Sequence, residues 1–437
     1  REVMKSNLIN SERNGRRKFI KSTGAAVIYS AAALNMGFPN PMFGQNSNTL
    51  KLGLIGCGGR GSGAAAQALN ADPDVVLYAM ADAFEDRLND SLEMLKKAHG
   101  GKVQVEKERQ FVGFDAYQKL IDSGVDVVLL ATPPAFRPDH ITAAVDAGKH
   151  IFCEKPVAVD APGVRKVKEA VKKSKEKNLS IVSGFTLRYS NSNRELFGRI
   201  LDGQIGDVKT ISHTRNGGGV WYKPRQENWS DMEYQMRNWY YYNWLSGDFI
   251  VEMIVHGLDL MSWSMGNKMP LRVTGNGGRQ VRVEEKYGNI YDHFGIEYEF
   301  ENEVRGFNFC RHWPDTSHRN TVEVAGTKGN AYFGGGKTRI TGKSEWQFEG
   351  EENNPYQVQH NELFAAIREG DPINDGDIMT NSTMMAIISR MAAYSGQTLT
   401  WEEALNSDKL LGPKSFSWDL KYSGPGVAIP GVTKALQ

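Results

Sequence analysis

A glycine-rich run between an apolar segment and a helix-like segment constrains the fold most strongly. Lys51–Ile55 is mostly apolar, Gly56-Cys57-Gly58-Gly59-Arg60-Gly61 follows at once, and Ser62–Asn70 has helical character. In a strand–turn–helix unit, the first glycine permits a tight turn, the second lets the backbone approach a pyrophosphate, and the third lets the helix lie close to the strand. Free N–H groups at the helix start favour anions. The pattern therefore predicts a dinucleotide-binding turn with these candidate residues: Gly56, Gly58, Gly59, Arg60 and Gly61.

An acidic residue ends the next apolar segment. Val75–Ala81 is followed by Asp82, 21 residues beyond Gly61. A carboxylate at this position accepts hydrogen bonds from ribose hydroxyls and repels a 2′-phosphate, so the sequence favours NAD over NADP. Arg60 and Arg87 would soften that preference, which leaves NADP open. The alternative is a glycine turn without a nucleotide, in which Asp82 is a helix N-cap.

Strand-like and helix-like segments continue to alternate up to residue 184. Val125–Ala131 is a continuous apolar run, typical of a strand buried on both faces, and Lys149–Cys153 and Leu179–Gly184 are further strands. This alternation predicts a parallel, doubly wound sheet that binds ligands beyond the carboxyl ends of its strands. The further candidate cofactor-binding residues at those ends are Thr132, Pro133, Glu154 and Lys155.

After residue 185 the pattern changes to short strands separated by turn signals, for example at Gly326–Gly329. Short alternating strands predict a largely antiparallel sheet with one covered face. Helix-like segments return at Gln357–Glu369 and Thr380–Ser395. An exposed sheet face is unusual in a monomer, so we expect a homo-oligomer.

Four of the nine tryptophans fall between residues 221 and 244, together with five tyrosines. Flat rings with polar neighbours are typical of surfaces that bind pyranose rings, and we select Trp239 and Trp244 as candidate substrate contacts. Core packing or a subunit contact explains such a cluster equally well.

A second candidate site lies between residues 247 and 259. If this segment is helical to its end, Glu252, His256 and Asp259 stand at i, i+4 and i+7 on one face. A histidine oriented by a carboxylate is a candidate general base near neutral pH. A metal site is the less favoured alternative, because no cysteine or second histidine stands at ligand spacing; a structural histidine is the other. We assign no metal.

Three segments, together with the predicted Glu252–Asp259 helix, resemble the Gfo/Idh/MocA family, named after glucose–fructose oxidoreductase and inositol dehydrogenase. They are Gly56–Gly61, Asp126–Pro134 and Ala147–Pro156, in which Glu154-Lys155-Pro156 follows Gly148-Lys149-His150. The resemblance spans about residues 50–400. It implies a Rossmann domain followed by an α/β domain on an open antiparallel sheet. We therefore expect an α/β chain with a doubly wound NAD(P)-binding domain at 46–185 and an α+β domain for substrate binding and oligomerisation at 186–437.

The resemblance also implies roles for matched residues. Lys155 would position the nicotinamide and the reacting hydroxyl, and His256 would take the hydroxyl proton. Glu252 stands where members of the family often have aspartate, four residues before that histidine. Arg188 and Tyr189 are implied as substrate contacts, and the alternative for Arg188 is a plain surface residue. We also select Asp259 as a substrate contact.

The first 35 residues differ from the rest in charge. They hold seven of the 52 basic residues and two of the 51 acidic ones, so the remaining chain carries 45 basic and 49 acidic side chains. Arg16-Arg17 before a short apolar stretch resembles a bacterial twin-arginine signal, which predicts export to the periplasm. We assign residues 1–45 to the signal and a tether. The alternative is a disordered or membrane-surface helix. We expect no stable membrane insertion after signal removal.

Composition excludes other classes. The near-balance of charge argues against a nucleic-acid partner, and three cysteines are too few for a disulfide framework. The leading hypothesis is an NAD(P)-dependent oxidoreductase acting on a sugar, glycoside or cyclitol, with a tightly bound, recycled cofactor. A redox-neutral NAD-dependent glycosidase or lyase is the first alternative, and a non-catalytic carbohydrate-binding protein is the second.

Overall fold

The structure, a computed structural model, describes residues 48–422 and 424–436, and the predicted signal lies outside this range. Its first part is a six-stranded parallel sheet, as predicted, with strand order β3-β2-β1-β4-β5-β6. The strands are β1 (Leu50–Ile55), β2 (Val75–Asp82), β3 (Gln110–Val112), β4 (Val127–Leu130), β5 (His150–Cys153) and β6 (Ile181–Ser183). The sequence analysis missed β3, which has only three residues and none of them buried.

Helices connect these strands and cover both faces of the sheet. They are α1 (Gly59–Ala71), α2 (Glu85–His99), α3 (Ala116–Ile121), α4 (Arg137–Asp146) and α5 (Ala161–Glu176). Strands β1 and β4 are adjacent, so the chain reverses direction across the sheet at this pair. In a doubly wound fold such a switch point places a crevice at the carboxyl edge of the strands.

The second sheet has nine strands in the order β14-β13-β12-β11-β7-β10-β9-β8-β15. Every neighbouring pair is antiparallel except β7 with β10. The strands are β7 (Val208–Gly217), β8 (Arg272–Gly278), β9 (His293–Glu299), β10 (Arg305–His312), β11 (Arg319–Gly326), β12 (Gly329–Gly334), β13 (Lys337–Gly342), β14 (Trp346–Gln347) and β15 (Leu399–Thr400).

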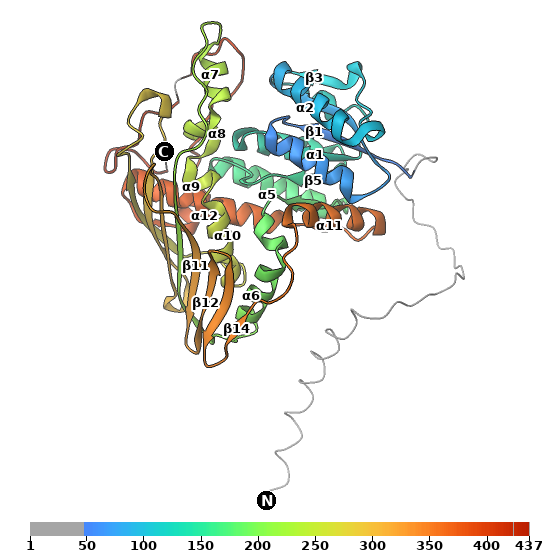
Figure 1. Ribbon diagram of the computed structural model, residues 1–437. Helices are drawn as coiled ribbons and strands as arrows, with labels where there is room; N and C mark the ends of the chain where they lie inside the picture. The colour runs from blue at the N-terminus through green and yellow to red at the C-terminus, as the bar shows by residue number, and fades with distance from the viewer. Residues whose placement is uncertain (1–47, 423, 437) are drawn as a thin grey trace, which may run out of the picture. The chain divides into compact units, whose positions relative to one another are not determined.

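Helices cover one face of this sheet and join it to the Rossmann part. They are α6 (Asn191–Leu201), α7 (Asp231–Arg237), α8 (Asn243–Ser246), α9 (Phe249–Glu252), α10 (Val255–Ser264), α11 (Pro355–Glu369), α12 (Gly376–Ser395) and α13 (Trp401–Leu405). Helix α12 contacts both β8 and α5, and α11 contacts α1, so the late helices pack on the first sheet (Figure 1).

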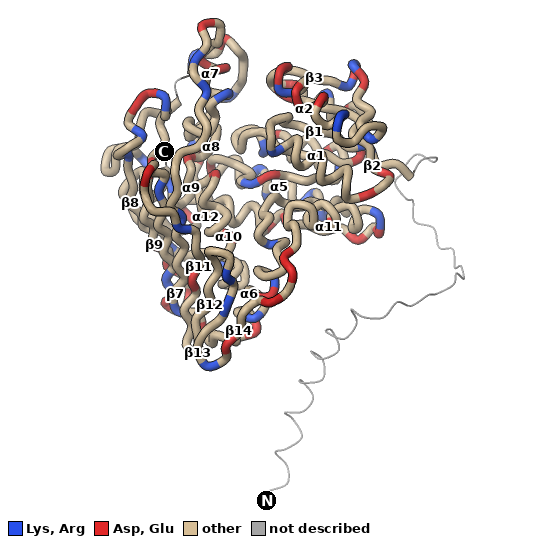
Figure 2. The backbone as a smooth tube through the Cα atoms, in the orientation of Figure 1, with Lys and Arg blue, Asp and Glu red and all other residues tan. Residues whose placement is uncertain are grey.

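Charged residues of both signs are interspersed along the described chain (Figure 2). In that part of the chain, no helix combines the length and the apolar character needed to cross a bilayer.

Candidate active site

The glycine loop has the geometry that a dinucleotide requires. Gly56 has φ +97°, and a Cβ at Gly61 would lie 1.8 Å from the Gly56 carbonyl oxygen, so both positions need glycine. A Cβ at Gly58 or Gly59 would have no atom within 4 Å, and no side chain caps the first turn of α1. The loop thus leaves free space beside unsatisfied N–H groups, and these residues fit a bound pyrophosphate.

Asp82 supports this loop directly. One carboxylate oxygen accepts a hydrogen bond from the Cys57 N–H at 2.6 Å, and the other accepts one from the Phe84 N–H at 2.9 Å. Burial raises the pKa of Asp82 above its usual range, and these two hydrogen bonds oppose that rise. Each oxygen keeps a second lone pair, which leaves acceptor capacity for ribose hydroxyls.

A cavity of about 560 Å³ opens at this edge of the sheet. Its walls include the glycine loop, Asp82, Thr132 and Pro133, so most of the predicted cofactor residues line one space. The opposite wall comes from the chain after β7. It contributes Trp221, Lys223, Met236, Arg237 and Trp239. Trp239, which the sequence analysis selected as a substrate contact, lines this cavity.

Glu154 and Arg60 form an ion pair at the end of β5. Arg60 Nε donates to Glu154 Oε1 at 2.5 Å, and Glu154 is 5% exposed. Arg60 lines the cavity, whereas Glu154 does not. Glu154 therefore does not face the cavity itself but holds the Arg60 guanidinium beside the glycine loop.

Lys155 is bound to Glu252 by two contacts. Its Nζ donates to the Glu252 backbone carbonyl at 2.5 Å and lies 3.2 Å from Glu252 Oε1. The Lys155 and Glu252 side chains are 12% and 17% exposed. The carbonyl belongs to the last residue of α9, where the helix dipole favours a cation. An ammonium has three N–H donors, so one remains for a ligand.

The predicted continuous helix through Glu252, His256 and Asp259 is wrong. Helix α9 ends at Glu252, and α10 begins at Val255. The N–H groups of Met253 and Ile254 both donate to the Phe249 carbonyl, which widens the turn and leaves the Glu252 carbonyl free for Lys155. Glu252 consequently binds Lys155 and does not orient His256.

The His256 ring lies at the start of α10, edge-on to Phe185 at 6.0 Å. Its Nδ1 is buried and has no hydrogen-bond partner among the described residues. Burial, followed by the charges of Lys155 and His213, lowers the pKa of His256 well below its usual range. A neutral imidazole can accept a proton. His256, Lys155 and Glu252 lie outside the lining of the 560 Å³ cavity.

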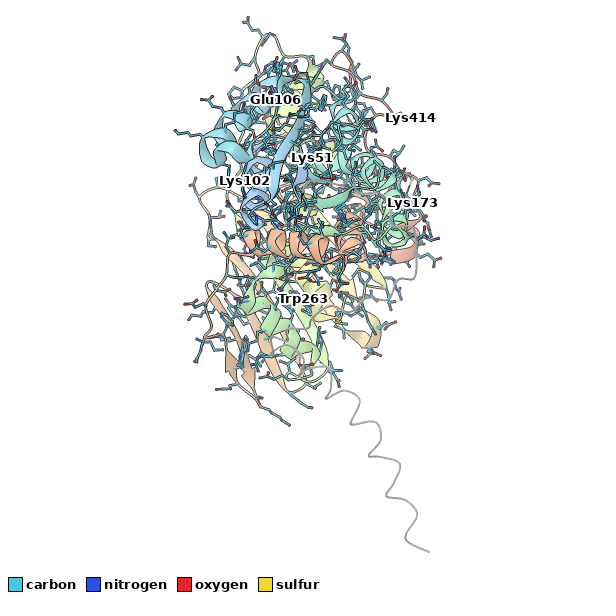
Figure 3. All side chains as sticks on the ribbon, turned by 90° about the vertical axis from the view of Figure 1, so that its right-hand side faces the viewer. Lys51, Lys102, Glu106, Lys173, Trp263 and Lys414 are labelled. Carbon is cyan, nitrogen blue, oxygen red and sulfur yellow. The ribbon has the colours of Figure 1, made fainter. Side chains whose placement is uncertain are left out.

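The substrate contacts expected at Arg188 and Asp259 are occupied within the fold. Arg188 binds Asp259 through two nitrogens at 2.8 and 2.9 Å, and Ser382 also donates to that carboxylate. Arg188 also stacks over Trp263 at 4.8 Å. In Figure 3, Trp263 lies on the second-sheet side of the molecule and Lys51 of β1 on the Rossmann side. The ion pair and the Ser382 hydrogen bond join the segment after β6 to α10 and α12.

Tyr189 and Trp244 are also buried. Tyr189 is 5% exposed and donates to Asp375 at 2.8 Å. Trp244 is fully buried and donates to Gln235 at 2.8 Å. Neither lines the cavity, and the structure places both rings in the core. The apolar surface of both rings satisfies core packing, and the sequence pattern could not distinguish this from binding.

Several cavity residues were missed by the sequence analysis. Phe84 and Phe114 follow β2 and β3, and Tyr117 stacks on His140 at 4.2 Å. Burial lowers the pKa of His140 to about 3, which keeps its ring neutral. Phe84 stands two residues after Asp82, which ends β2, and this position at a strand end could have identified it as a cavity residue. Within the described residues, no three His, Cys, Asp or Glu side chains form a metal-binding group.

Known proteins share both parts of this architecture. A sequence model described as "Oxidoreductase family, NAD-binding Rossmann fold" matches residues 50–182, and one described as "GFO/IDH/MocA C-terminal domain" matches residues 194–332. Inositol 2-dehydrogenase of Rhizobium meliloti is 28% identical over 248 residues, 57% of this chain and 64% of that protein. A 2,7-anhydro-N-acetylneuraminate hydratase of Mediterraneibacter gnavus is 26% identical over 260 residues, with the same coverage.

A solved aldose-aldose oxidoreductase of Caulobacter crescentus superposes with a TM-score of 0.64 at 18% identity, covering 81% of this chain and all of that one. A glycine loop at the switch point of a parallel sheet, followed by a second open sheet, is typical of a two-domain dinucleotide-binding protein. The chain belongs to the Gfo/Idh/MocA oxidoreductase family, and its cofactor is NAD. The matched stretch spans less than two thirds of the two curated relatives.

Proposed function

We propose that the protein is an NAD-dependent oxidoreductase that acts on a hydroxyl of a sugar, glycoside or cyclitol. The observation that carries this proposal is the arrangement at one sheet edge. The glycine loop and Asp82 line the cavity opposite the rings of Trp221 and Trp239. Outside that lining, Lys155 at the end of β5 is bound to Glu252 and has one free N–H, and the neutral imidazole of His256 lies at the start of α10. The inositol dehydrogenase relative supports a polyol substrate.

In the proposed mechanism, the glycine loop and Asp82 would hold NAD⁺, which would supply the acceptor for the hydride of the substrate carbon. His256 accepts the hydroxyl proton as the C–H bond breaks, so that an alcohol becomes a ketone. Lys155 donates its remaining N–H to the same oxygen and holds it in place. Glu252 fixes the Lys155 ammonium by accepting its other two N–H groups. Trp239 presents a ring face to the sugar.

The test is a substrate panel with purified protein. Wild type should reduce NAD with at least one cyclitol or aldose, and both Lys155→Met and His256→Asn should lower kcat by at least about 100-fold. Trp263→Phe, at the opposite end of α10 from His256, is the matched control and should keep wild-type turnover. Equal turnover in all four proteins would overturn the assignment. Sugar binding without hydride exchange would favour a carbohydrate-binding protein.

We further propose that the cofactor is held tightly and recycled. The C-terminal strap, residues 411–422, supports this because it backs the cavity wall. The ring centroid of Phe416 lies 5.8 Å from that of Phe114. The ring centroid of Trp418 lies 4.6 Å from that of Phe114 and 5.2 Å from that of Phe84. Arg237 of α7 also binds Asp86 of α2 at 2.9 Å. After extensive dialysis of the native protein, denaturation should release close to one equivalent of dinucleotide. A protein that releases none would contradict cofactor retention.

A redox-neutral reaction is the second candidate. A recycled cofactor permits transient oxidation, elimination or hydration at the neighbouring carbon, and re-reduction, with no net redox change. The hydratase relative favours this alternative. Product analysis decides: bond cleavage or hydration without accumulation of NADH supports it, whereas stoichiometric NADH supports simple oxidation.

For the first residues, we propose a twin-arginine signal and a periplasmic location. Arg16 and Arg17 lie outside the described residues, so the support is the sequence pattern alone. Substitution of both by lysine should retain the protein in the cytoplasm, while Lys18→Gln should not. Equal export of the double variant would contradict the proposal.

For the second sheet, we propose self-association through its uncovered face. Alternate residues of β10 point away from α10 and α12, and among them Phe309 is 53% exposed. Its cross-strand neighbours Thr214 and Gly295 are small, which leaves the ring prominent. Phe309→Glu should reduce the solution mass to that of the monomer, and an unchanged mass would refute the assignment.

A further inference from the structure

Arg215 on β7 is a cation that faces the same side of the second sheet as the candidate base. Strand β7 pairs with β10 in an uninterrupted register from Thr210 to Gly217, so residues two apart point to the same face. His213 points to the face that α10 covers, because a Cβ at Gly257 would lie 2.1 Å from its ring. Gly257 directly follows His256. The Arg215 side chain therefore leaves the sheet on the side of His256, one step nearer to the end of β7.

The Arg215 guanidinium has no carboxylate partner among residues 48–422 and 424–436. Its one hydrogen bond in that part of the chain runs from Nη1 to the Asn216 carbonyl oxygen and is 3.4 Å long. The group folds back beside Gly217, where a Cβ would lie 3.4 Å from Nη1, and the residue is partly exposed. A guanidinium has five N–H donors, so most of them are free for a ligand.

Two buried histidines place this guanidinium beside the candidate catalytic residues. Burial lowers the pKa of His213 to about 4 and that of His312 to about 3, and the charge of Arg215 contributes to both shifts. Arg215 is therefore near both rings. Nε2 of His312 lies 3.3 Å from the hydroxyl of Tyr240, and burial, followed by the charge of Glu252, raises the pKa of that hydroxyl. The chain of neighbours thus leads from Arg215 to the candidate base on one side and to Glu252 on the other.

The charges at this place leave one cation without a counterion. Lys155 and Glu252 neutralise each other at 3.2 Å. Arg282, another cation nearby, is 2% exposed and is countered by Asp248. Both histidines are neutral at pH 7, so they add no charge. Arg215 is thus the charge that a substrate has to match, and its complement is a single negative charge.

We propose that Arg215 binds a carboxylate of the substrate, so that the substrate is an acidic sugar such as a hexuronic acid or its glycoside. The planar guanidinium fork matches the two oxygens of a carboxylate, whereas a dianionic phosphate monoester would leave one charge unmatched. Asn320 lies directly opposite Arg215 on β11, so its amide is on the same face and supplies a further neutral donor. The carboxylate takes no part in hydride transfer; its contact with Arg215 fixes the ring so that a hydroxyl reaches Lys155 and His256. The inference rests on the proposed function, because it names the substrate class of the same site.

Isothermal titration calorimetry of the full chain, loaded with NADH, tests the proposal without turnover. The ligands are glucuronate and galacturonate, each compared with its neutral parent sugar and with the corresponding sugar 6-phosphate. In wild type, at least one uronate should bind at least about tenfold more tightly than its neutral parent, because it gains a charge-assisted contact. Arg215→Gln should abolish this preference and change the affinity for the neutral sugar by less than about twofold, whereas Arg215→Lys, which keeps the charge but loses the fork, should retain part of the preference. Arg272→Gln removes a 58% exposed arginine from β8 of the same sheet and is the matched control, which should keep the full preference.

Three results would overturn the proposal. Equal or undetectable binding of the uronates and their neutral parents in wild type would show that no carboxylate is recognised. A uronate preference that survives in Arg215→Gln would assign the recognition of charge to another residue. Tighter binding of the 6-phosphates than of the uronates would assign Arg215 to a phosphate. Because turnover is measured separately, uronate binding without hydride exchange would refute the proposed function and leave carboxylate recognition intact, whereas oxidation of neutral sugars alone would refute only this inference.

Discussion

The ion pair between Lys155 and Glu252 should be strongly coupled, and a double-mutant cycle measures that coupling. At the 3.2 Å separation and an effective dielectric constant of about 20, the Coulomb attraction is about 5 kcal/mol. Desolvation and partial exposure reduce the net value. We expect Lys155→Met and Glu252→Gln each to lower the free energy of unfolding by about 2–3 kcal/mol, because each leaves a largely buried charge without its partner.

The two single variants should not be equal. Glu252→Gln leaves the backbone carbonyl contact to Lys155 intact, whereas Lys155→Met removes both contacts. The lysine variant should therefore cost about 1 kcal/mol more. The double variant leaves neither charge unpaired, so its loss should be about 2 kcal/mol smaller than the sum of the single losses.

Urea unfolding followed by tryptophan fluorescence at pH 7 gives these free energies. The control cycle is Lys166→Met with Asp139→Asn, an ion pair whose side chains are 48% and 53% exposed, for which the coupling should stay below about 1 kcal/mol. A Lys155–Glu252 coupling no larger than that of the control pair would refute the reasoning, because the buried contact would then contribute no more than a solvated one.

Three further outcomes test other parts of the structure. Gly61→Ala should weaken dinucleotide binding by at least about 100-fold in dialysis, because its Cβ would lie 1.8 Å from the Gly56 carbonyl oxygen, while Gly63→Ala on the same helix should bind normally. Trp239→Ala should raise KM for sugars with little change in dinucleotide affinity; an unchanged KM would remove Trp239 from the substrate wall. Acid should destabilise the fold, because burial lowers the pKa of several histidines and the unfolded chain binds more protons. These histidines are His140, His312 and His360, with pKa values of about 3, and His213, at about 4. Between pH 6.5 and about 4, each should reduce the free energy of unfolding by up to about 1.4 kcal/mol per pH unit, visible as a falling urea midpoint, and a flat profile would contradict neutral burial.

The parts of the site that were predictable from sequence depend on local geometry. A glycine loop between a strand and a helix binds through backbone groups, so its residues and their spacing carry the information. The places of Thr132 and Pro133 were predictable for a related reason, because parallel strands have their carboxyl ends at one edge of the sheet. These residues line the same cavity in the structure.

The surroundings of other candidate residues depend on contacts between distant segments and could not be predicted from the sequence. Trp244 belongs to an aromatic cluster typical of a binding surface, but it is buried, because it donates to Gln235 and packs on Phe416 of the strap. Arg188 and Asp259 are 71 residues apart and neutralise each other. Lys223 carries no local signal for its place in the cavity wall, because that place depends on the segment after β7 reaching the edge of the first sheet. Periodicity and motif spacing describe neighbours along the chain and contain none of these pairings.

The break between α9 and α10 shows how a local irregularity joins the two sheets into one site. A regular helix through residue 256 would use the Glu252 carbonyl for its own hydrogen bond and would orient Glu252 toward His256. The observed turn frees that carbonyl, and Lys155 from the end of β5 occupies it. The Rossmann strand end is thereby attached to the helix that carries the candidate base. His256 lacks a carboxylate partner and remains neutral, and the acidic residue that family resemblance placed beside the histidine acts on the lysine instead.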